Sequence, residues 1–454
     1  MKNGLKPLEQ NRAIKMKKIL IILLFLSNCL IAQMSGDGSS GNPYKISSQA
    51  GFDSIKTNST LATSGYYFRM KNDIDLSGLS STWFISNFYG HIDGNNHTLR
   101  NFTKDSQAQL YFIATFQGGS FKNIKIRNWN QSWIGTVTNG SFGMLFGLLD
   151  GTYPKVEIEN VDIDSCTYYW KSTFSSSDIR AFGIVSGQTY LLNNNIIMKR
   201  IKIGENVVVT YWDYSTTTAV RNFGAFCGYL SGSGKFSLEE SSVKATLRYQ
   251  IGNATTNQVI SNNRRAGSLL GRLVSLAQGR VQIQNNYSKV KWVNDLAGSV
   301  ERASFIGSIG SNTTDTNYCF IKKNYAVDTV LSDVIKLVSI MWIDWTLSPT
   351  DTITNNYFGI SKVSAGGWSL YGSQTSTTPT GMNSKIDSDM KIQSTFQKYD
   401  FDNIWDIHTD VNAGYPFLRW SDAAPVASNV ISIRALKINN RIRLFNGRKA
   451  VKSF

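Results

Sequence analysis

Histidine, cysteine and proline are scarce in this chain, and the shortage of the first two narrows the possible functions. The 454 residues include three histidines, four cysteines and seven prolines. A hydrolase that uses histidine as its base therefore has few candidates, which are His91, His97 and His408. No CxxC pair is present, so neither a zinc site nor a disulfide framework is indicated. The Gly-x-Ser-x-Gly, HExxH, Walker and dinucleotide-binding motifs of common enzyme classes are also missing.

Charged residues make up only 17% of the chain, although the net charge is +16. The positive excess lies at the two ends. Residues 1–33 carry +5 and residues 425–454 carry +7, which leaves +4 for everything between them. Because the excess is not on one face of the body, we expect no nucleic-acid partner.

The first 32 residues resemble an export signal. Lys17 and Lys18 precede an apolar run from residue 19 to residue 26, which is too short to span a bilayer, and a polar Gly/Ser stretch follows. We predict a signal peptide at 1–32 that is cleaved after Ala32, with residues 1–15 as an upstream extension. Lipidation at Cys29 is the alternative, which Asn28 disfavours. No later segment is apolar enough to cross a membrane, so we expect a protein that is secreted or held at the outer-membrane surface.

Two short strand patterns recur through the chain. Members of the first begin at residues 121, 158, 198, 238, 283, 321 and 353, so their starts are 37, 40, 40, 45, 38 and 32 residues apart. The second pattern is glycine-rich, and its closing glycines, from Gly147 to Gly310, are spaced 40, 41, 43 and 39 residues apart.

A repeat of about 40 residues built from short strands cannot bury its apolar face alone, so neighbouring repeats must stack. Apolar and polar residues alternate in the strands, as in the segment 155–164, and helical periodicity is absent. The pattern predicts an all-β solenoid of parallel coils, with two turns in each repeat. A four-stranded propeller blade has a similar period, but the repeats lack a regular set of four strands.

Three segments resemble the GLUG-motif surface proteins of bacteria. Residues 41–46, 67–76 and 88–99 are similar to the opening of these proteins, and the Gly-x-x-x-Gly strands are similar to their repeat. Residues 401–405 and 414–420 resemble their closing segment. The resemblance implies a right-handed parallel β-helix, here over residues 33–420, on a secreted or cell-surface protein. It implies no catalytic residues.

Residues 421–454 depart from that resemblance and form a basic tail. The segments 430–438 and 441–445 read as two strands joined by a short turn. The tail is either a degenerate or truncated type IX secretion signal or a simple basic appendage.

Four carboxylates are candidate metal ligands. Asp73 and Asp75 lie two residues apart on one strand, which places them on one face roughly 6.5–7 Å from each other. Asp162 and Asp164 continue an acidic row that begins with Glu157 and Glu159. Such pairs could bind Ca²⁺, although capping of the first coils and a solvated strand face are the simpler explanations. We otherwise expect no cofactor.

A large aromatic ring follows five successive copies of the first strand pattern. The offsets from the strand starts are 8, 12, 14, 11 and 9 residues, for Trp129, Trp170, Trp212, Tyr249 and Trp292. Rings in equal register would stack in a column on the solenoid. The column is either an internal stack that seals the core or an exposed track on which sugar rings lie.

The sequence therefore favours a binding or adhesion module over an enzyme, and glycans or other cell-surface components are the partners we expect. The alternative is a polysaccharide lyase or glycoside hydrolase on a β-helix scaffold, because such lyases replace histidine by arginine or lysine with Ca²⁺-bound carboxylates. An enzyme requires a groove in which Asp/Glu and Lys/Arg side chains converge, whereas an adhesin requires only an exposed face.

Overall fold

The computed structural model describes two separate units, residues 1–384 and 385–454. The described residues are 34–105, 110–137, 140–174, 180–192, 194–213, 221–251, 264–274, 280–293, 302–310, 318–330, 337–343, 352–359, 371–373, 381–422, 433–438, 441–446 and 449–453. The predicted signal peptide, its cleavage point and Cys29 lie outside this set.

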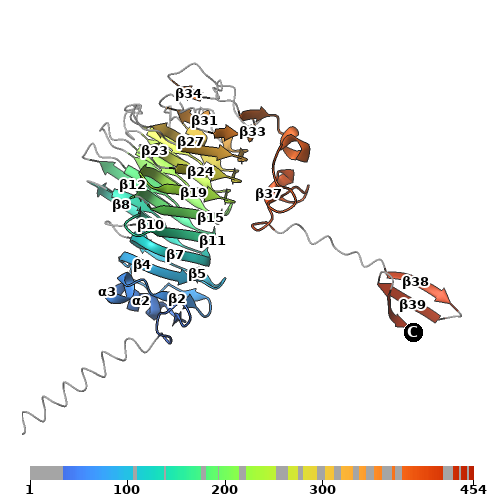
Figure 1. Cartoon of the computed structure of the whole chain (residues 1–454), viewed down its shortest axis with the longest axis horizontal. Coiled ribbons are helices and arrows are strands. Elements are labelled where there is room, and N and C mark those ends of the chain that lie inside the picture. Colours follow the sequence, from blue (N-terminus) through green and yellow to red (C-terminus); the bar gives the residue numbers. More distant parts are fainter. Residues whose placement is uncertain are drawn as a thin grey trace, which may run out of the picture. The chain divides into compact units, whose positions relative to one another are not determined.

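The first unit is a parallel β-helix, which confirms the predicted fold class (Figure 1). The seven strands of the first repeat pattern lie side by side with β4 (Ile85–Asp93) in a large parallel sheet: β7 (Ile113–Arg127), β11 (Lys155–Asp164), β15 (Asn195–Ile203), β19 (Lys235–Glu239), β24 (Arg280–Gln284), β28 (Tyr318–Lys322) and β32 (Thr352–Thr354). Ile158 pairs in register with Phe121 of the preceding repeat and with Met198 of the next. Successive repeats are thus direct neighbours, so each repeat forms one turn of the solenoid and the predicted two turns are wrong.

Each strand of the first pattern bends at one residue in the left-handed region. The φ angles of these residues lie between 48° and 57°, at Asn123, Asn160, Arg200, Glu240, Asn285, Lys323 and Asn355. Asparagine tolerates this conformation better than most residues. The bend shifts the side-chain alternation by one residue, so in β11 Val156 and Ile158 before it and Val161 and Ile163 after it are all buried. Short strands continue beyond the bend in other coils: β5 (Thr98–Arg100), β20 (Ser242–Val243), β25 (Tyr287–Ser288), β29 (Tyr325–Ala326) and β33 (Asn356–Gly359).

A second parallel sheet covers another side of each coil. Its strands are β6 (Thr103–Asp105), β8 (Asn130–Val137), β12 (Thr167–Phe174), β16 (Val208–Asp213), β21 (Thr246–Ile251), β26 (Lys291–Val293) and β30 (Thr329–Val330). These strands follow one another in the sheet in the order of the chain.

The glycine-rich pattern closes each coil as two short strands with a tight turn between them. The first strand of each pair is β9 (Gly140–Gly143), β13 (Arg180–Gly183), β17 (Arg221–Gly224) or β22 (Arg264–Gly267). The second is β10 (Phe146–Asp150), β14 (Ser186–Leu191), β18 (Cys227–Gly232) or β23 (Leu270–Val274), and β27 (Arg302–Gly310), β31 (Leu337–Ile343) and β34 (Tyr371–Ser373) continue the series. A Cβ atom on Gly183 or Gly224 would collide with a backbone carbonyl across the turn, which explains the glycine at this position.

Two helices, which the sequence did not predict, lie at the N-terminal end of the solenoid. They are α2 (Gln49–Thr57) and α3 (Ser59–Thr63), among the strands β1 (Tyr44–Ile46), β2 (Tyr67–Met70) and β3 (Ile74–Asp75). Phe52 and Ile55 of α2 are fully buried, and the Phe52 ring packs edge-on against Phe112 at 5.6 Å. The helices thus cover the end of the apolar core. No helix in the described ranges is long and apolar enough to cross a membrane.

The second unit contains no described strand of the solenoid type beyond the end of β35 (Met382–Lys385). Its first part holds 3₁₀ turns at Asp389–Lys391, Gln393–Thr395 and Asn412–Gly414, and an antiparallel pair of β36 (Trp405–Asp406) with β37 (Phe417–Leu418). The solenoid therefore ends near residue 385 and not at residue 420 as expected. The tail forms an antiparallel sheet of β38 (Ile433–Ile438), β39 (Arg441–Asn446) and β40 (Lys449–Ser453), in which the third strand was not predicted.

Candidate functional site

The five rings of the predicted aromatic column do not share one register. In the second sheet Trp170 pairs with Trp133, with Tyr211 and, through Tyr211, with Tyr249. Trp212 is the next residue after Tyr211, so it points to the opposite face of the sheet. Trp129 precedes β8, and Trp292 pairs with Leu247. The offsets counted from the starts of the first-pattern strands were misleading, because the segment between each of these strands and the following strand of the second sheet varies in length.

Most of these rings are buried, so they cannot form an exposed track for a ligand. Trp129, Trp170 and Trp292 are each 0% exposed. Trp170 stacks on Trp133 with ring centroids 5.5 Å apart and on Tyr211 at 4.6 Å. The internal stack is therefore what the structure shows around Trp170, and the exposed-track interpretation is wrong for the three buried rings. Trp212 is half-buried, and the ring of Tyr249 lies outside the described part of the chain.

Asp73 and Asp75 accept hydrogen bonds from strand β5, from the residue after it and from the turn that follows Asp75. Asp73 accepts a 2.8 Å hydrogen bond from the Thr98 backbone, which lowers the pKa of its carboxyl group. The side chain and backbone of Ser77 lower the pKa of Asp75 to about 2, and Asn101 donates to the same carboxylate at 2.7 Å. Each carboxylate thus has its own local partners.

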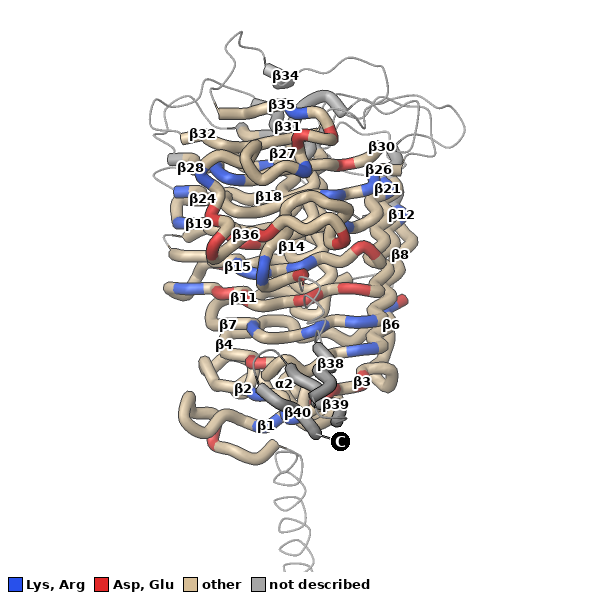
Figure 2. Tube along the Cα trace, turned by 90° about the vertical axis from the view of Figure 1, so that its right-hand side faces the viewer, with Lys and Arg blue, Asp and Glu red and all other residues tan. Residues whose placement is uncertain are grey.

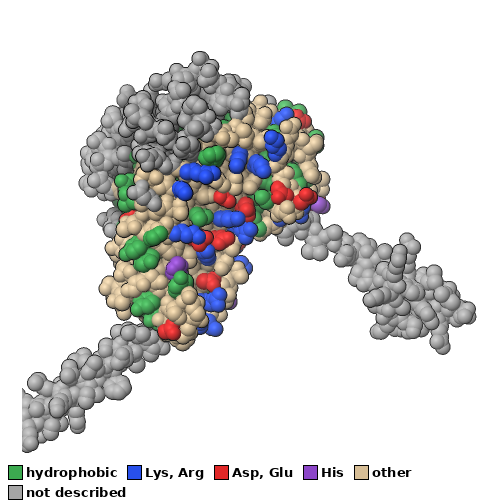
Figure 3. All heavy atoms as spheres, viewed as in Figure 1, with side chains coloured by type: hydrophobic (Ala, Val, Ile, Leu, Met, Phe, Trp, Pro, Cys, Tyr) green, Lys and Arg blue, Asp and Glu red, His purple; other side chains and the backbone are tan. Residues whose placement is uncertain are grey.

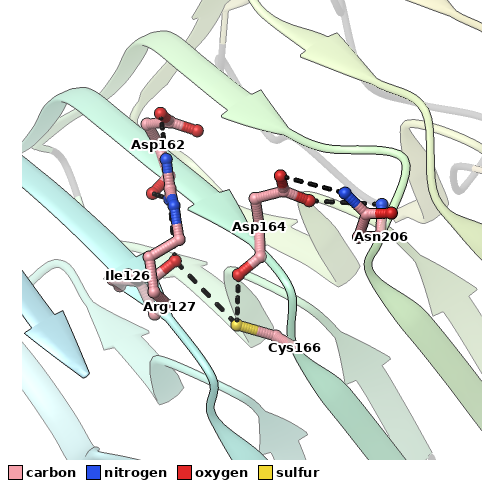
Figure 4. A network of polar contacts seen from close by, with 6 residues as sticks. All are labelled: Ile126, Arg127, Asp162, Asp164, Cys166 and Asn206. Atoms are coloured by element: carbon pink, nitrogen blue, oxygen red, sulfur yellow. Dashed lines mark hydrogen bonds and ion pairs between the residues drawn. The ribbon is translucent and has the colours of Figure 1, made fainter. Parts of the chain in front are cut away.

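Asp162 and Asp164 point to different partners (Figure 4). Arg127 pairs with Asp162 at 2.5 Å, whereas Asn206 donates to Asp164 from its backbone at 3.2 Å and from its amide at 3.3 Å. Across the described ranges, no group of three His, Cys, Asp or Glu side chains could hold a metal ion. A calcium role for these aspartates stays a prediction.

The outer face of the first sheet carries a row of charges that alternate in sign from coil to coil. The register aligns Arg69, Asp93, Lys122, Glu159, Lys199 and Glu239 on successive strands. Arg69 pairs with Asp93 at 2.9 Å, and Lys122 reaches Glu159 at 3.4 Å. Figure 3 shows the resulting band of basic and acidic side chains on this face of the solenoid. Opposite charges on adjacent strands stabilise the stacking of coils.

A groove of about 480 Å³ lies on this face across four coils. Residues from β11, β15, β19 and β24 line it: Glu157, Glu159, Asn195, Ile196, Ile197, Lys199, Lys235, Phe236, Ser237, Glu239, Arg280 and Gln282. The groove brings together half of the predicted acidic row, Glu157 and Glu159. Asp162 and Asp164 lie beyond the bend and are not among its lining residues.

The carboxylates of the groove are all held by neighbouring side chains. Glu157 pairs with Lys122 at 2.6 Å and with Lys155 at 3.1 Å. Burial opposes ionisation of Glu157, but the bonds from the two lysines outweigh it, and the pKa of Glu157 is lowered. Burial likewise opposes the charge of Lys122, yet Glu157 raises its pKa overall. Both groups therefore remain charged at neutral pH.

Glu239 and Lys199 complete the polar lining. Glu239 accepts hydrogen bonds from Ser237 and, at 3.1 Å, from Gln282. Lys199 pairs at 3.1 Å with Glu240, which is outside the groove. The groove is thus a fixed array of donors and acceptors from four consecutive coils.

A smaller hollow of about 300 Å³ lies further toward the N-terminus on the same face. His91 and Tyr67 line it and stack with ring centroids 4.0 Å apart, and His91 Nδ1 is 3.0 Å from Ser120 Oγ. Burial and then the charge of Lys122 lower the pKa of His91, so its imidazole is neutral at pH 7. Lys122 lines this hollow and pairs with Glu157 of the groove. The Lys122–Glu157 ion pair therefore separates the hollow from the groove.

The sequence reasoning missed the groove residues Lys235, Arg280 and Gln282. They precede or alternate with the apolar residues of the first repeat pattern, at positions where a strand faces outward. Comparing these outward positions from repeat to repeat, as well as the inward ones, would have aligned them.

No protein-family model matches the chain, and no curated protein matches it. One similar solved structure is a crystal structure from Bacteroides ovatus, of a protein provisionally described as an immunoglobulin A1 protease. The likeness covers 85% of this chain and 95% of that chain, with 15% sequence identity and a TM-score of 0.40. At this level the likeness supports no statement about activity, and the resemblance to GLUG-motif proteins stays a prediction.

Proposed function

We propose that the protein is a secreted or surface-displayed binding module that holds a glycan chain in the groove across β11, β15, β19 and β24 without cleaving it. The observation that carries the proposal is the groove itself, which presents amide, hydroxyl, carboxylate and ammonium groups on four consecutive coils. Hydroxyl-rich ligands require many such partners, both donors and acceptors.

The spacing of the coils supports an extended ligand that lies along the solenoid. Parallel strands are about 4.8 Å apart, so a chain crossing them meets an equivalent set of side chains at that interval. This interval is close to the length of one sugar unit. Ser237 and Gln282, which are in register on β19 and β24, are one such pair of hydrogen-bonding groups.

One observation favours the alternative, a polysaccharide lyase or glycoside hydrolase. Carboxylates and cations do converge in the groove, as an enzyme requires. A general acid, however, needs a raised carboxyl pKa, whereas the pKa of Glu157 is lowered by the lysines that bind it. The convergence therefore supports binding better than proton transfer.

The test is a glycan-array screen of the full chain, followed by calorimetry with the best ligand. Ser237→Tyr places a bulky ring in the groove and should abolish binding. Ile134→Tyr is the matched control, because Ile134 is 56% exposed on the second sheet, away from the groove. Circular dichroism of both variants establishes that the fold is intact.

Incubation of the ligand with the protein separates the two functions. We expect no new reducing ends and no unsaturated sugar product. Product formation that Glu157→Gln abolishes would instead establish the enzyme. If Ser237→Tyr and Ile134→Tyr bind equally well, the groove is not the site.

Export is tested separately, by N-terminal sequencing of the protein recovered outside the cell. The mature chain should begin at Gln33. Retention of residues 1–32 in exported material, or a lipid attached to Cys29, would contradict the proposed processing.

A further inference from the structure

The N-terminal ends of four adjacent strands form a row of exposed donors at one edge of the groove. We call Lys155, Asn195, Lys235 and Arg280 the basic row, after its three cations. They are in register on β11, β15, β19 and β24, and all four are exposed. Figure 2 shows basic positions above one another where β19 and β24 begin. The row therefore presents donors to a ligand at intervals of about 4.8 Å.

Two cations of the basic row pair with no carboxylate of the described residues. Lys155 pairs with Glu157 at 3.1 Å, but within the described part of the chain no ion pair involves Lys235 or Arg280. The Arg280 guanidinium lies over the Phe320 ring, 4.5 Å from its centroid. That stacking orients the planar group and leaves its N–H edges free to form bonds in the plane.

The acidic groups of the groove do not cancel these two charges. Glu157 and Glu159 are neutralised by Lys122, and Glu157 also by Lys155. Glu239 lies four residues after Lys235 on β19, which is roughly 13 Å along the strand and beyond a Debye length of about 8 Å at physiological salt. An anion that approaches the basic row thus meets uncompensated positive charge.

From these positions we infer that the groove selects an acidic glycan, whose anionic groups bind Lys235 and Arg280 while Asn195 and Gln282 bond its hydroxyls. The inference rests on the proposed function and adds the class of ligand. Two cations on adjacent coils match a chain that carries a negative group on neighbouring sugars. A carboxylate or a sulfate would serve, because both accept charge-assisted bonds from guanidinium and ammonium groups.

The first experiment compares ligands on the full chain by calorimetry. Hexagalacturonate should bind at least tenfold more tightly than its fully methyl-esterified form, which has the same shape without the charges. A carboxylate-free sulfated hexasaccharide should also bind more tightly than the ester. The ratio of its affinity to that of hexagalacturonate identifies which anion is preferred. The affinity should fall as NaCl rises from 0.05 to 0.5 M, because the contacts are exposed.

The second experiment removes the cations. Lys235→Gln with Arg280→Gln should weaken hexagalacturonate binding by about tenfold to a hundredfold and weaken binding of the methyl ester much less. The matched control is Lys125→Gln with Lys291→Gln, which removes the same charge from exposed positions outside the groove and should change neither affinity.

Equal affinity for the acid and its ester, or equal losses in the two double variants, would overturn the inference while the proposed glycan binding stands. Tight binding of a hexaglutamate peptide or a hexathymidylate, equal to that of the acidic sugars, would overturn the choice of a glycan. Failure to bind any charged or neutral saccharide would overturn the proposed function as well.

Discussion

The coils around β7, β11 and β15 keep their charged side chains on the outer face, whereas the coils around β24, β28 and β32 place polar side chains inside. In the earlier coils both sides of the bend bury apolar residues, such as Ile158 and Val161. In the later coils the residue after the bend is a fully buried asparagine, which is Asn286, Asn324 or Asn356.

These three asparagines form a hydrogen-bonded ladder. Asn324 Oδ1 accepts from the backbone of Asn286 at 2.9 Å and from its amide at 3.0 Å. The Asn324 amide donates to Asn356 Oδ1 at 3.0 Å and to the Ile283 carbonyl at 2.9 Å. Every group is satisfied only if the coils are stacked in one register, so the ladder fixes that register in a way that apolar contacts do not.

The later coils also bury an ionisable group. The Asp328 carboxylate accepts bonds from Ser288, from the Val290 backbone at 2.9 Å and from Trp292 Nε1 at 3.4 Å. Burial nevertheless raises the pKa of Asp328 to about 7. The comparison shows that the outer polar rows lie at the surface of the solenoid, whereas the inner polar rows hold successive coils together.

The largest effect is expected from breaking the inner ladder. Asn324→Leu keeps the branched shape and the number of heavy atoms but leaves the Asn286 donors and the Ile283 carbonyl without their Asn324 partners inside the core. We expect a loss of about 3 kcal/mol in the free energy of unfolding, measured by urea denaturation. Hydrogen exchange should accelerate in peptides from β24, β28 and β32 before it does in β7 and β11.

The control for the ladder is Asn195→Leu, because Asn195 is an exposed amide of the groove. Its effect on stability should stay within about 0.5 kcal/mol. If the two variants are equally stable, the inner and outer rows do not differ as the structure indicates.

The second effect concerns pH and is confined to the later coils. The pKa of Asp328 is raised in the folded state, so the folded protein binds this proton more tightly than the unfolded chain does. Its stabilising contribution is complete below about pH 4 and is lost as the pH rises toward 7, with a slope of at most about 1.4 kcal/mol per pH unit. Urea denaturation at several pH values should reveal this decline, and Asp328→Asn should remove it. If Asp328→Asn has the same slope of unfolding free energy against pH as the parent protein, another group is responsible for the decline.

The difference between the two regions could be predicted only in part from the sequence. The period of the repeats and the alternation in residues 155–164 were enough for the parallel solenoid. The recurring Asn-Tyr of the later repeats was visible too, but nothing in the sequence states that the bend turns this asparagine inward. That direction depends on the left-handed residue before it, such as Asn285 or Lys323, and the Lys323 position has no sequence signature.

The candidate site was less predictable, because it depends on register between distant residues. Glu157 and Glu159 were visible as an acidic row, but their partner Lys122 comes from the previous coil and the cations Lys235 and Arg280 from later ones. Side chains about 40 residues apart become neighbours only when each repeat is one turn, and the sequence alone suggested two.

The smallest effect on stability is expected from the outer row. Lys122→Met removes the ion pairs with Glu157 and Glu159 but retains the aliphatic part of the side chain. Exposed or half-exposed pairs contribute little, so the free energy of unfolding should fall by only about 0–1 kcal/mol. The pKa of Glu157 should rise toward its usual value, because one of the two lysines that lower it is lost. At neutral pH the groove then carries one more uncompensated negative charge, since Lys122 no longer offsets Glu157, and binding of hexagalacturonate should weaken while that of its methyl ester is retained. A loss of stability as large as that of Asn324→Leu would contradict the distinction, since it would mean that the outer row holds the coils together as strongly as the inner ladder does.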